Sequence, residues 1–344
     1  MPGTTCNWGI LGTARIATKV VEAMKLAPDA HPMAIGSRSI GTAESFASEH
    51  GLERAYGSYD EVLQDPDIDV VYIPLPTTMH MEWTIKAAEA GKHVLCEKPM
   101  TPCAADLERM IAACDDANVQ LMDGVMFMHH PRTGEITNHL PSIGGRPTYM
   151  VSVFTFPGSS DFFESNIRIN PDAEPLGCIG DLGWYNTRMS LLAFGHEMPR
   201  RVRSNWHATC NGVPTHATCE LEFDGNAPST FQCSFLHTLR NWCEICGSDG
   251  TLFLEDFVLG PPEETRYYTK IQERDAQGSP REVKTEHSVD GCVQEALMVQ
   301  QMCSIALGRD PIDPYWTDIA LKTQRIMDAL MISGAEDGRP VEIE

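Results

Sequence analysis

Residues 6–17 read Cys6-Asn-Trp-Gly-Ile-Leu-Gly12-Thr-Ala-Arg-Ile-Ala17, a short apolar run that ends in glycine and continues into a helix-compatible segment. The turn matches the pattern Gly-x-Gly-x-x-Gly/Ala, with alanine in the second position. Gly12 allows a tight turn, the small Ala14 lets a pyrophosphate approach the helix N-terminus, and Ala17 permits close packing of helix on sheet. Any strand–helix junction with a glycine turn would look similar, so the setting of the turn decides its meaning.

The same strand-then-helix unit recurs along the N-terminal third of the chain. Apolar runs at 32–36, 69–73 and 93–96 each precede a helical pattern, and 119–122 supplies a fifth strand. Short buried strands that alternate with helices are typical of a parallel sheet covered on both faces. The glycine turn follows the first strand of a βαβ unit, which is the setting the motif requires. We therefore expect an α/β fold in which residues 1–130 form a doubly wound Rossmann domain.

The pattern changes after residue 130. Strand-like segments separated by Gly, Pro or Asn now predominate, at 146–156, 201–207, 217–223, 230–237 and 242–246. Helical patterns remain at 182–194, 294–307 and 317–333. These features predict a second, α+β domain over residues 131–344, built on one open and mainly antiparallel sheet.

The composition excludes several classes of protein. No stretch of the 344 residues approaches the roughly 18 apolar residues needed to span a bilayer, so we expect no membrane association. The net charge of −22 disfavours binding to nucleic acid or anionic lipid, since both carry negative charge. The N-terminal residues show no cationic and apolar signal regions, and the twelve cysteines are scattered through apolar patterns. We expect a cytoplasmic protein with reduced cysteines.

The end of the second strand bears on the choice of dinucleotide. An NAD-specific fold usually places Asp or Glu there, to accept hydrogen bonds from the ribose hydroxyls, but this chain has Ser37-Arg38-Ser39. A carboxylate would repel a 2′-phosphate, whereas arginine and hydroxyl groups bind it. Arg38 could instead be a solvated loop cation. The sequence therefore favours NADP as the cofactor, with NAD as the less favoured alternative.

A lysine follows the fourth strand in the sequence Glu97-Lys98-Pro99. In a doubly wound sheet, ligands bind outside the carboxyl ends of the strands. Lys98 would therefore point into the cofactor crevice, and the proline fixes the turn that carries it.

Four motifs together resemble the Gfo/Idh/MocA (glucose-fructose oxidoreductase) family over almost the whole chain. They are the Gly12 turn, Pro74-Leu-Pro-Thr-Thr-Met-His80, Glu97-Lys98-Pro99 and Gly177-Cys-Ile-Gly-Asp181-Leu-Gly-Trp-Tyr185. The resemblance is strongest to the branch that holds dimeric dihydrodiol dehydrogenases, NADP-linked D-xylose 1-dehydrogenases and related plant oxidoreductases. The match is specific because Glu-Lys-Pro is joined to the later Gly-x-x-x-Asp-x-Gly-x-Tyr pattern.

This resemblance implies a Rossmann domain followed by a substrate-binding domain whose open sheet often serves for dimerisation, hence a homodimer. It also implies a catalytic lysine, Lys98, and an acid/base residue at Tyr185, a position that is histidine in other branches. Asp181, one helical turn before Tyr185, would orient substrate hydroxyls or tune the pair.

The expected cofactor contacts come from the turn, from the second strand end and from the resemblance. They are Gly12, Thr13, Ala14, Arg15, Ile16, Ser37, Arg38, Leu75, Pro76, Thr77, His80, Glu97, Lys98, Phe127 and His129. His130 and Arg132 follow the same strand as His129 and are also expected near the nicotinamide or the substrate. His129 stands where many relatives carry arginine, which leaves the charge preference for the substrate open.

The chemistry agrees with these residue types. Oxidation of an alcohol removes the hydroxyl proton while hydride leaves carbon, and a phenol with a pKa of about 10 accepts that proton poorly unless a cation lies nearby. Lys98 could be that cation or could bond the reacting oxygen directly. No metal is expected, because the nicotinamide accepts the hydride.

The expected function is therefore an NADP-dependent dehydrogenase or reductase that acts on a secondary alcohol or carbonyl of a polyhydroxylated small molecule, namely a sugar, cyclic polyol or diol. One alternative is an NADPH-dependent reductase of a keto- or anhydro-sugar. Another is a non-catalytic regulator that senses the dinucleotide, although such a protein has no need for the pair Lys98 and Tyr185. The exact substrate and the physiological direction depend on loops that the sequence does not define.

Overall fold

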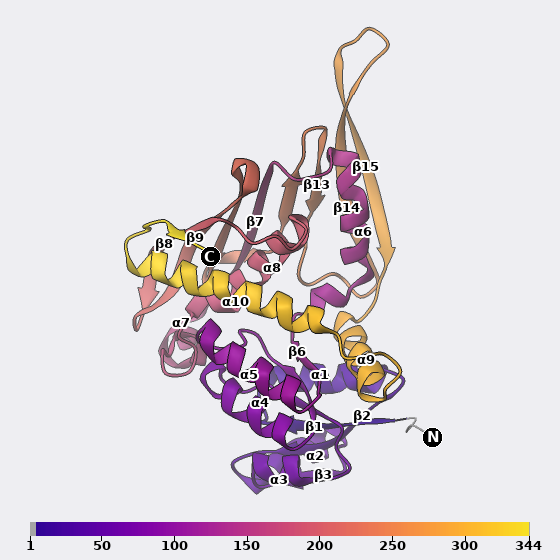
Figure 1. Cartoon of the computed structure of the whole chain (residues 1–344), viewed down its shortest axis with the longest axis vertical. Coiled ribbons are helices and arrows are strands. Elements are labelled where there is room, and N and C mark those ends of the chain that lie inside the picture. Colours follow the sequence, from indigo (N-terminus) through magenta and orange to yellow (C-terminus); the bar gives the residue numbers. More distant parts are fainter. Residues whose placement is uncertain (1–4, 344) are drawn as a thin grey trace. The chain divides into compact units, whose positions relative to one another are not determined.

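The computed structural model describes residues 5–343, which divide into two compact units (Figure 1). Unit 1 holds the residues up to 129 together with 293–324, and unit 2 holds 130–292 together with the residues from 325 onward. The first boundary lies next to the one expected at residue 130. The segment 293–324 differs from the expectation, because it belongs to unit 1 and not to the second domain.

The return of this segment to unit 1 has a physical cause. Helix α9 (Gln294–Ala306) buries Met298, Val299, Met302 and Cys303 and packs against α1 (Arg15–Leu26). The indole Nε1 of Trp8 donates to Cys303 Sγ at 3.3 Å. These apolar contacts join residues almost 300 positions apart, so no local pattern in the sequence could reveal them.

Unit 1 is built on a six-stranded parallel sheet with the order β3-β2-β1-β4-β5-β6, which confirms the doubly wound Rossmann fold. The strands are β1 (Cys6–Leu11), β2 (Ala30–Gly36), β3 (Arg54–Tyr56), β4 (Val70–Ile73), β5 (His93–Cys96) and β6 (Leu121–Asp123). The remaining helices are α2 (Ile40–His50), α3 (Tyr59–Gln64), α4 (His80–Glu89), α5 (Ala104–Asp116) and the start of α10 (Pro314–Ala335). The strand order reverses between β1 and β4, and a ligand crevice forms at such a point, outside the carboxyl ends of the strands.

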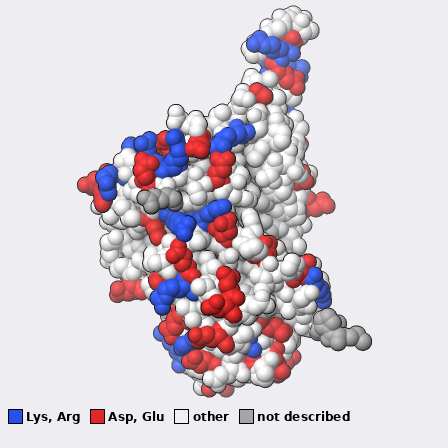
Figure 2. Space-filling model, in the orientation of Figure 1, with Lys and Arg blue, Asp and Glu red and all other residues white. Residues whose placement is uncertain are grey.

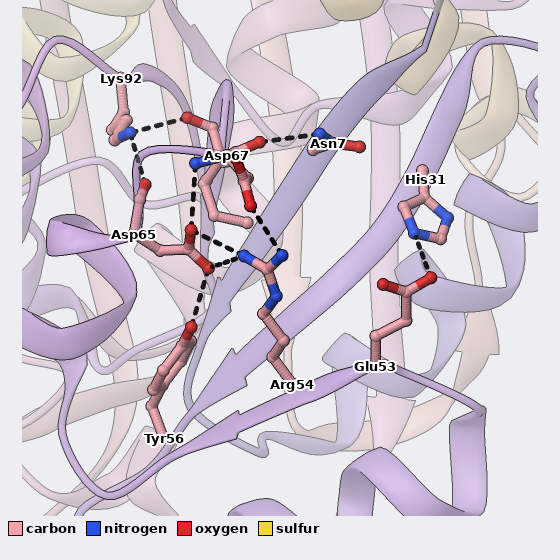
Figure 3. Close-up of polar contacts among 9 residues, drawn as sticks. Asn7, His31, Glu53, Arg54, Tyr56, Asp65, Asp67 and Lys92 are labelled. Atoms are coloured by element: carbon pink, nitrogen blue, oxygen red, sulfur yellow. Dashed lines mark hydrogen bonds and ion pairs between the residues drawn. The ribbon is translucent and has the colours of Figure 1, made fainter.

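A polar cluster closes the opposite, amino end of β1 and β4 (Figure 3). The Asp65 carboxylate accepts from Arg54 Nη1 at 2.8 and 2.7 Å, from Tyr56 Oη at 2.8 Å and from the Asp67 amide at 3.0 Å. Lys92 Nζ donates to the carbonyls of Asp65 and Ile68 at 2.8 and 2.7 Å. We call these residues the Asp65 cluster. It ties the loop before β4 to β3 and to the start of β5, on the side away from the expected ligands.

Unit 2 is built on a ten-stranded sheet in which most neighbours are antiparallel, as expected, although β7 and β10 pair in parallel. Its strands are β7 (Tyr149–Pro157), β8 (Arg201–Cys210), β9 (Val213–Phe223), β10 (Ala227–Ser234), β11 (Leu236–Arg240), β12 (Cys243–Cys246), β13 (Gly250–Leu254), β14 (Glu264–Arg274), β15 (Pro280–Asp290) and β16 (Val341–Glu342). Its helices include α6 (Pro131–His139), α7 (Ser160–Ser165) and α8 (Trp184–Ala193). Every residue of α8 is buried, whereas side chains on alternate positions of β10 stay partly exposed. One face of the sheet is thus packed and the other is open.

The hairpin of β14 and β15 extends beyond the other strands of unit 2 (Figure 1). The sequence did not predict it, because β15 is exposed or half-exposed at every position and therefore lacks the alternation of apolar and polar residues that marks a half-buried strand. The ladder itself is regular over eleven residue pairs.

All twelve cysteines lie in the described residues and none forms a disulfide. Eight are buried, with Cys6, Cys96, Cys114 and Cys303 in unit 1 and Cys178, Cys219, Cys233 and Cys243 in unit 2. They act as small apolar residues of the two cores.

Asp and Glu side chains crowd the surface over the helices of unit 1, with Lys and Arg among them (Figure 2). This distribution agrees with the strongly negative net charge. Within residues 5–343, no helix is both long and apolar enough to cross a membrane.

Candidate active site

The turn after β1 has the backbone that only glycine adopts readily. Gly12 has a φ of +103°, and a Cβ at this position would lie 3.0 Å from Leu75 Cδ2. Its amide donates to the Gly36 carbonyl at 2.8 Å, which fixes the turn against the end of β2. The chain therefore passes close beside the loop that follows β4, with no side chain in between.

Helix α1 begins at this turn without a side-chain cap. Its N-cap residue, Ala14, makes no side-chain hydrogen bond, and no acidic residue occupies the first turn. The first amides of a helix have no partner within the helix, and the N-terminus carries a partial positive charge. Thr13 and Ala14 are half-exposed, and Arg15 and Ile16 are exposed. This arrangement fits the pyrophosphate of a dinucleotide.

The end of β2 presents hydroxyl groups and a cation. Ser37 is buried, and its amide donates to the Tyr56 carbonyl. Arg38 is exposed, and no ion pair within residues 5–343 involves it. Ser39 is the N-cap residue before α2, whose first turn holds no acidic residue. The segment after β2 thus carries a guanidinium, and the first turn of α2 carries no carboxylate, which leaves the predicted contact with a 2′-phosphate open to test.

His80 connects two loops at the carboxyl edge of the sheet. Its Nε2 lies 2.7 Å from the Leu75 carbonyl, and its Nδ1 lies 3.0 and 3.1 Å from the carbonyls of Pro99 and Met100. Burial lowers the pKa of the His80 ring, although the carbonyls oppose that shift. Only 1% of His80 is exposed, so the buried ring links the two loops through its contacts with their carbonyls. Its expected place in the lining of the cofactor pocket stays a prediction.

Lys98 follows directly on β5, and its neighbour Glu97 is held firmly. Tyr72 Oη donates to Glu97 Oε1 at 2.6 Å, and the Lys98 amide donates to Glu97 Oε2 at 3.3 Å. A Cβ on Gly124 would meet the Glu97 carboxylate at 3.1 Å, so glycine leaves the room for it. The peptide bond between Lys98 and Pro99 is cis. Lys98 is half-exposed at the edge of the sheet where the crevice is expected.

The segment after β6 is held by the C-terminal part of unit 1. The His129 ring stacks on Trp316 with the centroids 4.5 Å apart, and its Nδ1 lies 2.9 Å from Gln301 Oε1. Phe127 is buried. Trp316 and Gln301 could not be predicted as neighbours of His129, because they lie more than 170 positions away from it in the sequence.

His130 and Arg132 do not lie where we expected them. Arg132 is 1% exposed, and its guanidinium donates to the carbonyls of Asp256 at 2.5 Å and Phe257 at 3.1 Å. Burial lowers the pKa of Arg132 to about 10 and that of His130 to about 4. The expectation that these two side chains reach nicotinamide or substrate is wrong, since both are packed into the interior of unit 2.

Asp181 and Tyr185 lie at the start of α8 in unit 2. A π-helical turn, η5 (Ile179–Gly183), precedes α8 and carries Asp181. π-Helical turns are rare in proteins, and many of those that occur lie at functional sites. Asp181 and Tyr185 are 9% and 6% exposed, and the Tyr185 ring packs edge-on against Phe154 at 5.5 Å. Gly177 fixes the approach to the turn, because a Cβ there would lie 2.3 Å from the Pro214 carbonyl oxygen.

Arg168 is the functional candidate that the sequence analysis missed. Its Nε donates to Asp181 Oδ2 at 2.7 Å. It lies in η4 (Ile167–Ile169), an irregular segment with no periodic pattern around it. Nothing in the sequence distinguishes it from a solvated surface arginine.

Known proteins resemble this chain in sequence and in fold. Residues 6–125 match the model described as "Oxidoreductase family, NAD-binding Rossmann fold", and residues 144–253 match the "GFO/IDH/MocA C-terminal domain". A D-xylose 1-dehydrogenase (NADP(+)) of Haloferax volcanii is 36% identical over 71% of this chain and 74% of its own length. A trans-1,2-dihydrobenzene-1,2-diol dehydrogenase of Xenopus laevis is 28% identical over 87% of this chain and 93% of its own length. The crystal structure of KijD10, a 3-ketoreductase from Actinomadura kijaniata in complex with NADP and TDP-benzene, has a TM-score of 0.85 at 25% identity and covers 96% of this chain and 98% of its own.

Proposed function

Because this chain belongs to the Gfo/Idh/MocA family of oxidoreductases, we propose that it transfers a hydride between NADP and a secondary alcohol or carbonyl of a sugar, cyclic polyol or diol. One observation carries the proposal. The carboxyl edge of unit 1 combines an uncapped helix start, an exposed Arg38 and the Lys98 that follows β5. Xylose and dihydrodiol dehydrogenases among the relatives support the class of substrate.

Unit 1 would hold the cofactor along this edge. The pyrophosphate would lie over Gly12 and the start of α1, against Thr13, Ala14, Arg15 and Ile16, and the 2′-phosphate would bind Ser37 and Arg38. The loops that hold Leu75, Pro76, Thr77 and Glu97 would border the rest, together with Phe127 and His129. When bound, NADP supplies the hydride acceptor for oxidation and, in its reduced form, the hydride donor for reduction.

Tyr185 would move the proton of the reacting oxygen. During oxidation its phenolate accepts the proton of the substrate hydroxyl, and during reduction its phenol returns that proton to the carbonyl oxygen. Lys98 would stabilise the negative charge on these oxygens, and Asp181 would orient the substrate hydroxyls. One proton thus passes between Tyr185 and the reacting oxygen in each direction of the reaction.

A reductase of a keto-sugar is the second candidate, because the similar KijD10 structure is that of a 3-ketoreductase. A regulator that binds NADP without turnover is less favoured, since this chain keeps both Lys98 and Tyr185. We also propose that the protein is a cytoplasmic homodimer. The open face of the unit 2 sheet favours a second copy, and twelve free cysteines suit a reducing compartment.

The test is a panel of sugars, polyols and diols, each assayed with NADP and with NAD, and of keto-sugars assayed with NADPH. Absorbance of the reduced nicotinamide follows turnover, and quenching of tryptophan fluorescence follows binding. Turnover that prefers NADP supports the proposal. Tight NADP binding without turnover on the whole panel would favour the regulator.

A further inference from the structure

Arg168 is built into unit 2 so that it meets Asp181. Its amide donates to Asn166 Oδ1 at 3.0 Å, and the carbonyl of the next residue, Ile169, accepts from Asn211 Nδ2 at 3.0 Å. Ile169 itself is buried. The short turn is therefore anchored on both sides of Arg168, and the geometry of its contact with Asp181 is defined by the fold.

The charge on Asp181 matters to Tyr185, which lies one helical turn further on. A carboxylate one helical turn away opposes the formation of a phenolate, because like charges disfavour each other's ionised forms. A guanidinium that hydrogen-bonds the carboxylate cancels most of this effect. The Asp181 charge raises the pKa of Arg168 and burial opposes this shift, while the hydrogen bond to Asp181 and the charges of Glu174 and Tyr185 add to it. By reciprocity, the Arg168 cation favours the ionised form of Tyr185.

Aromatic side chains pack against this part of unit 2. Phe154 on β7 covers the Tyr185 ring with an apolar edge, and Phe231 on β10 packs against Gly183. The titratable and charged groups on the segment before η5, on η5 and on α8 are Arg168, Asp172, Glu174, Cys178, Asp181, Tyr185 and Arg188, and Cys233 on β10 faces Cys178.

We propose that Arg168 is a positioning residue of the reaction, which holds Asp181 in place and neutralises its carboxylate so that Tyr185 can ionise beside it. The inference rests on the acid/base role proposed above for Tyr185. It differs from a purely structural ion pair, because the Arg168 side chain is 41% exposed and such pairs contribute little to stability.

The direct test is a pH titration of Tyr185 by NMR in protein labelled with carbon-13 at the tyrosine Cζ. The chain has eight tyrosines, and the signal that is lost in Tyr185→Phe identifies the resonance. The variants are Arg168→Gln, Arg168→Lys and Asp181→Asn. Arg146→Gln is the matched control, because Arg146 forms an exposed pair with Glu197 in the same unit.

Arg168→Gln should move the titration midpoint of Tyr185 to higher pH by about one unit, because the substitution removes a positive charge that favours the phenolate. Asp181→Asn should move it to lower pH, Arg168→Lys should lie near wild type, and Arg146→Gln should have no effect. Shifts of the Tyr185 midpoint that have opposite signs in Arg168→Gln and Asp181→Asn cannot arise from a general loosening of the helix. An unchanged midpoint in Arg168→Gln, or shifts of the same sign in both partners, overturns the proposal.

This readout needs no substrate, so it separates the inference from the proposed function. Failure of the whole substrate panel would leave the titration of Tyr185 measurable. With an active substrate, the variants should follow the same order in the pH profile of kcat/KM for oxidation as in the Tyr185 midpoints. The ascending limb of this profile should move to higher pH in Arg168→Gln. If Arg168→Gln folds poorly, Arg168→Lys and Asp181→Asn still decide the outcome, because Asp181→Asn must lower the midpoint.

Discussion

Replacement of Asp65 with asparagine tests the Asp65 cluster of unit 1 (Figure 3). The side chain of Asp65 is only 3% exposed and accepts hydrogen bonds from Arg54, Tyr56 and the Asp67 amide. Asparagine keeps the shape and one acceptor oxygen but loses the charge and the paired contact with Arg54. The variant should therefore fold and should be less stable than wild type.

The size of the loss follows from the geometry. Breaking a fully buried ion pair costs about 3 to 5 kcal/mol. Asp65 is buried, but its partner Arg54 is one-third exposed and keeps a second contact with Asp67 at 2.7 Å. Solvent screening reduces the penalty accordingly, and we expect a loss of about 2 kcal/mol in the free energy of unfolding of unit 1.

The loss should depend on pH in a defined way. Burial raises the pKa of the Asp65 carboxyl, but the hydrogen bonds from Arg54, the Asp67 amide and Tyr56 outweigh it and leave that pKa below its ordinary value. Such a group stabilises the fold above its unfolded pKa of about 3.9, and this contribution disappears as the pH falls through the folded value. Wild type and Asp65→Asn should therefore differ at pH 7 and should converge in acid.

Hydrogen exchange of peptides from β1 and β4, measured by mass spectrometry in increasing urea, reports the opening of unit 1 separately from unit 2. Asp67→Asn is the matched control, because Asp67 is 56% exposed and its loss should cost about 0.5 kcal/mol or less. An equal loss of stability in Asp67→Asn and Asp65→Asn, or an effect of Asp65→Asn that stays constant into acid, would contradict the role assigned to the buried Asp65 carboxylate.

Three further variants test the cofactor edge. Lys98→Ala should lower kcat by about 100-fold or more while NADP binding changes little, whereas Lys86→Ala, on the exposed part of α4, should leave kcat unchanged. Equal kcat in both variants would remove Lys98 from the mechanism. Arg38→Ala should raise the Kd for NADP by about tenfold or more, through the loss of a charge-assisted hydrogen bond, and should leave the Kd for NAD alone; equal effects on both would exclude a 2′-phosphate contact. Gly12→Ala should weaken NADP binding and lower Tm more than Gly51→Ala, because both have positive φ but only Gly12 would place its Cβ against Leu75. Calorimetric titration and thermal unfolding measure both quantities.

The sequence predicts those parts of the fold that depend on local patterns. The strand–turn–helix repeats of unit 1 and the Gly12 turn are local, because the burial period and the turn residue lie within a few positions of each other. The return of α9 to unit 1 depends on contacts between distant segments, and the β14–β15 hairpin lacks a buried face. Neither leaves a local signal.

The candidate site shows the same division. Lys98 and residues 37–39 could be located because each follows directly on a strand that the sequence predicts. Arg168 could not be located, because only the folded structure brings it next to its partner Asp181. For Arg132 the local pattern pointed to a ligand contact that the fold does not support. A charged residue soon after a strand suggests a ligand contact, yet two main-chain carbonyls bind its guanidinium inside unit 2.

The buried cysteines can serve as natural probes of unfolding. Four buried thiols lie in each unit, and a thiol shielded from solvent reacts with an alkylating reagent only when its surroundings open. A pulse of reagent followed by peptide mapping would give labelling rates for Cys96 and Cys114 in one unit and for Cys219 and Cys243 in the other. The order of these rates would show which unit opens first, with no substitution introduced into the protein.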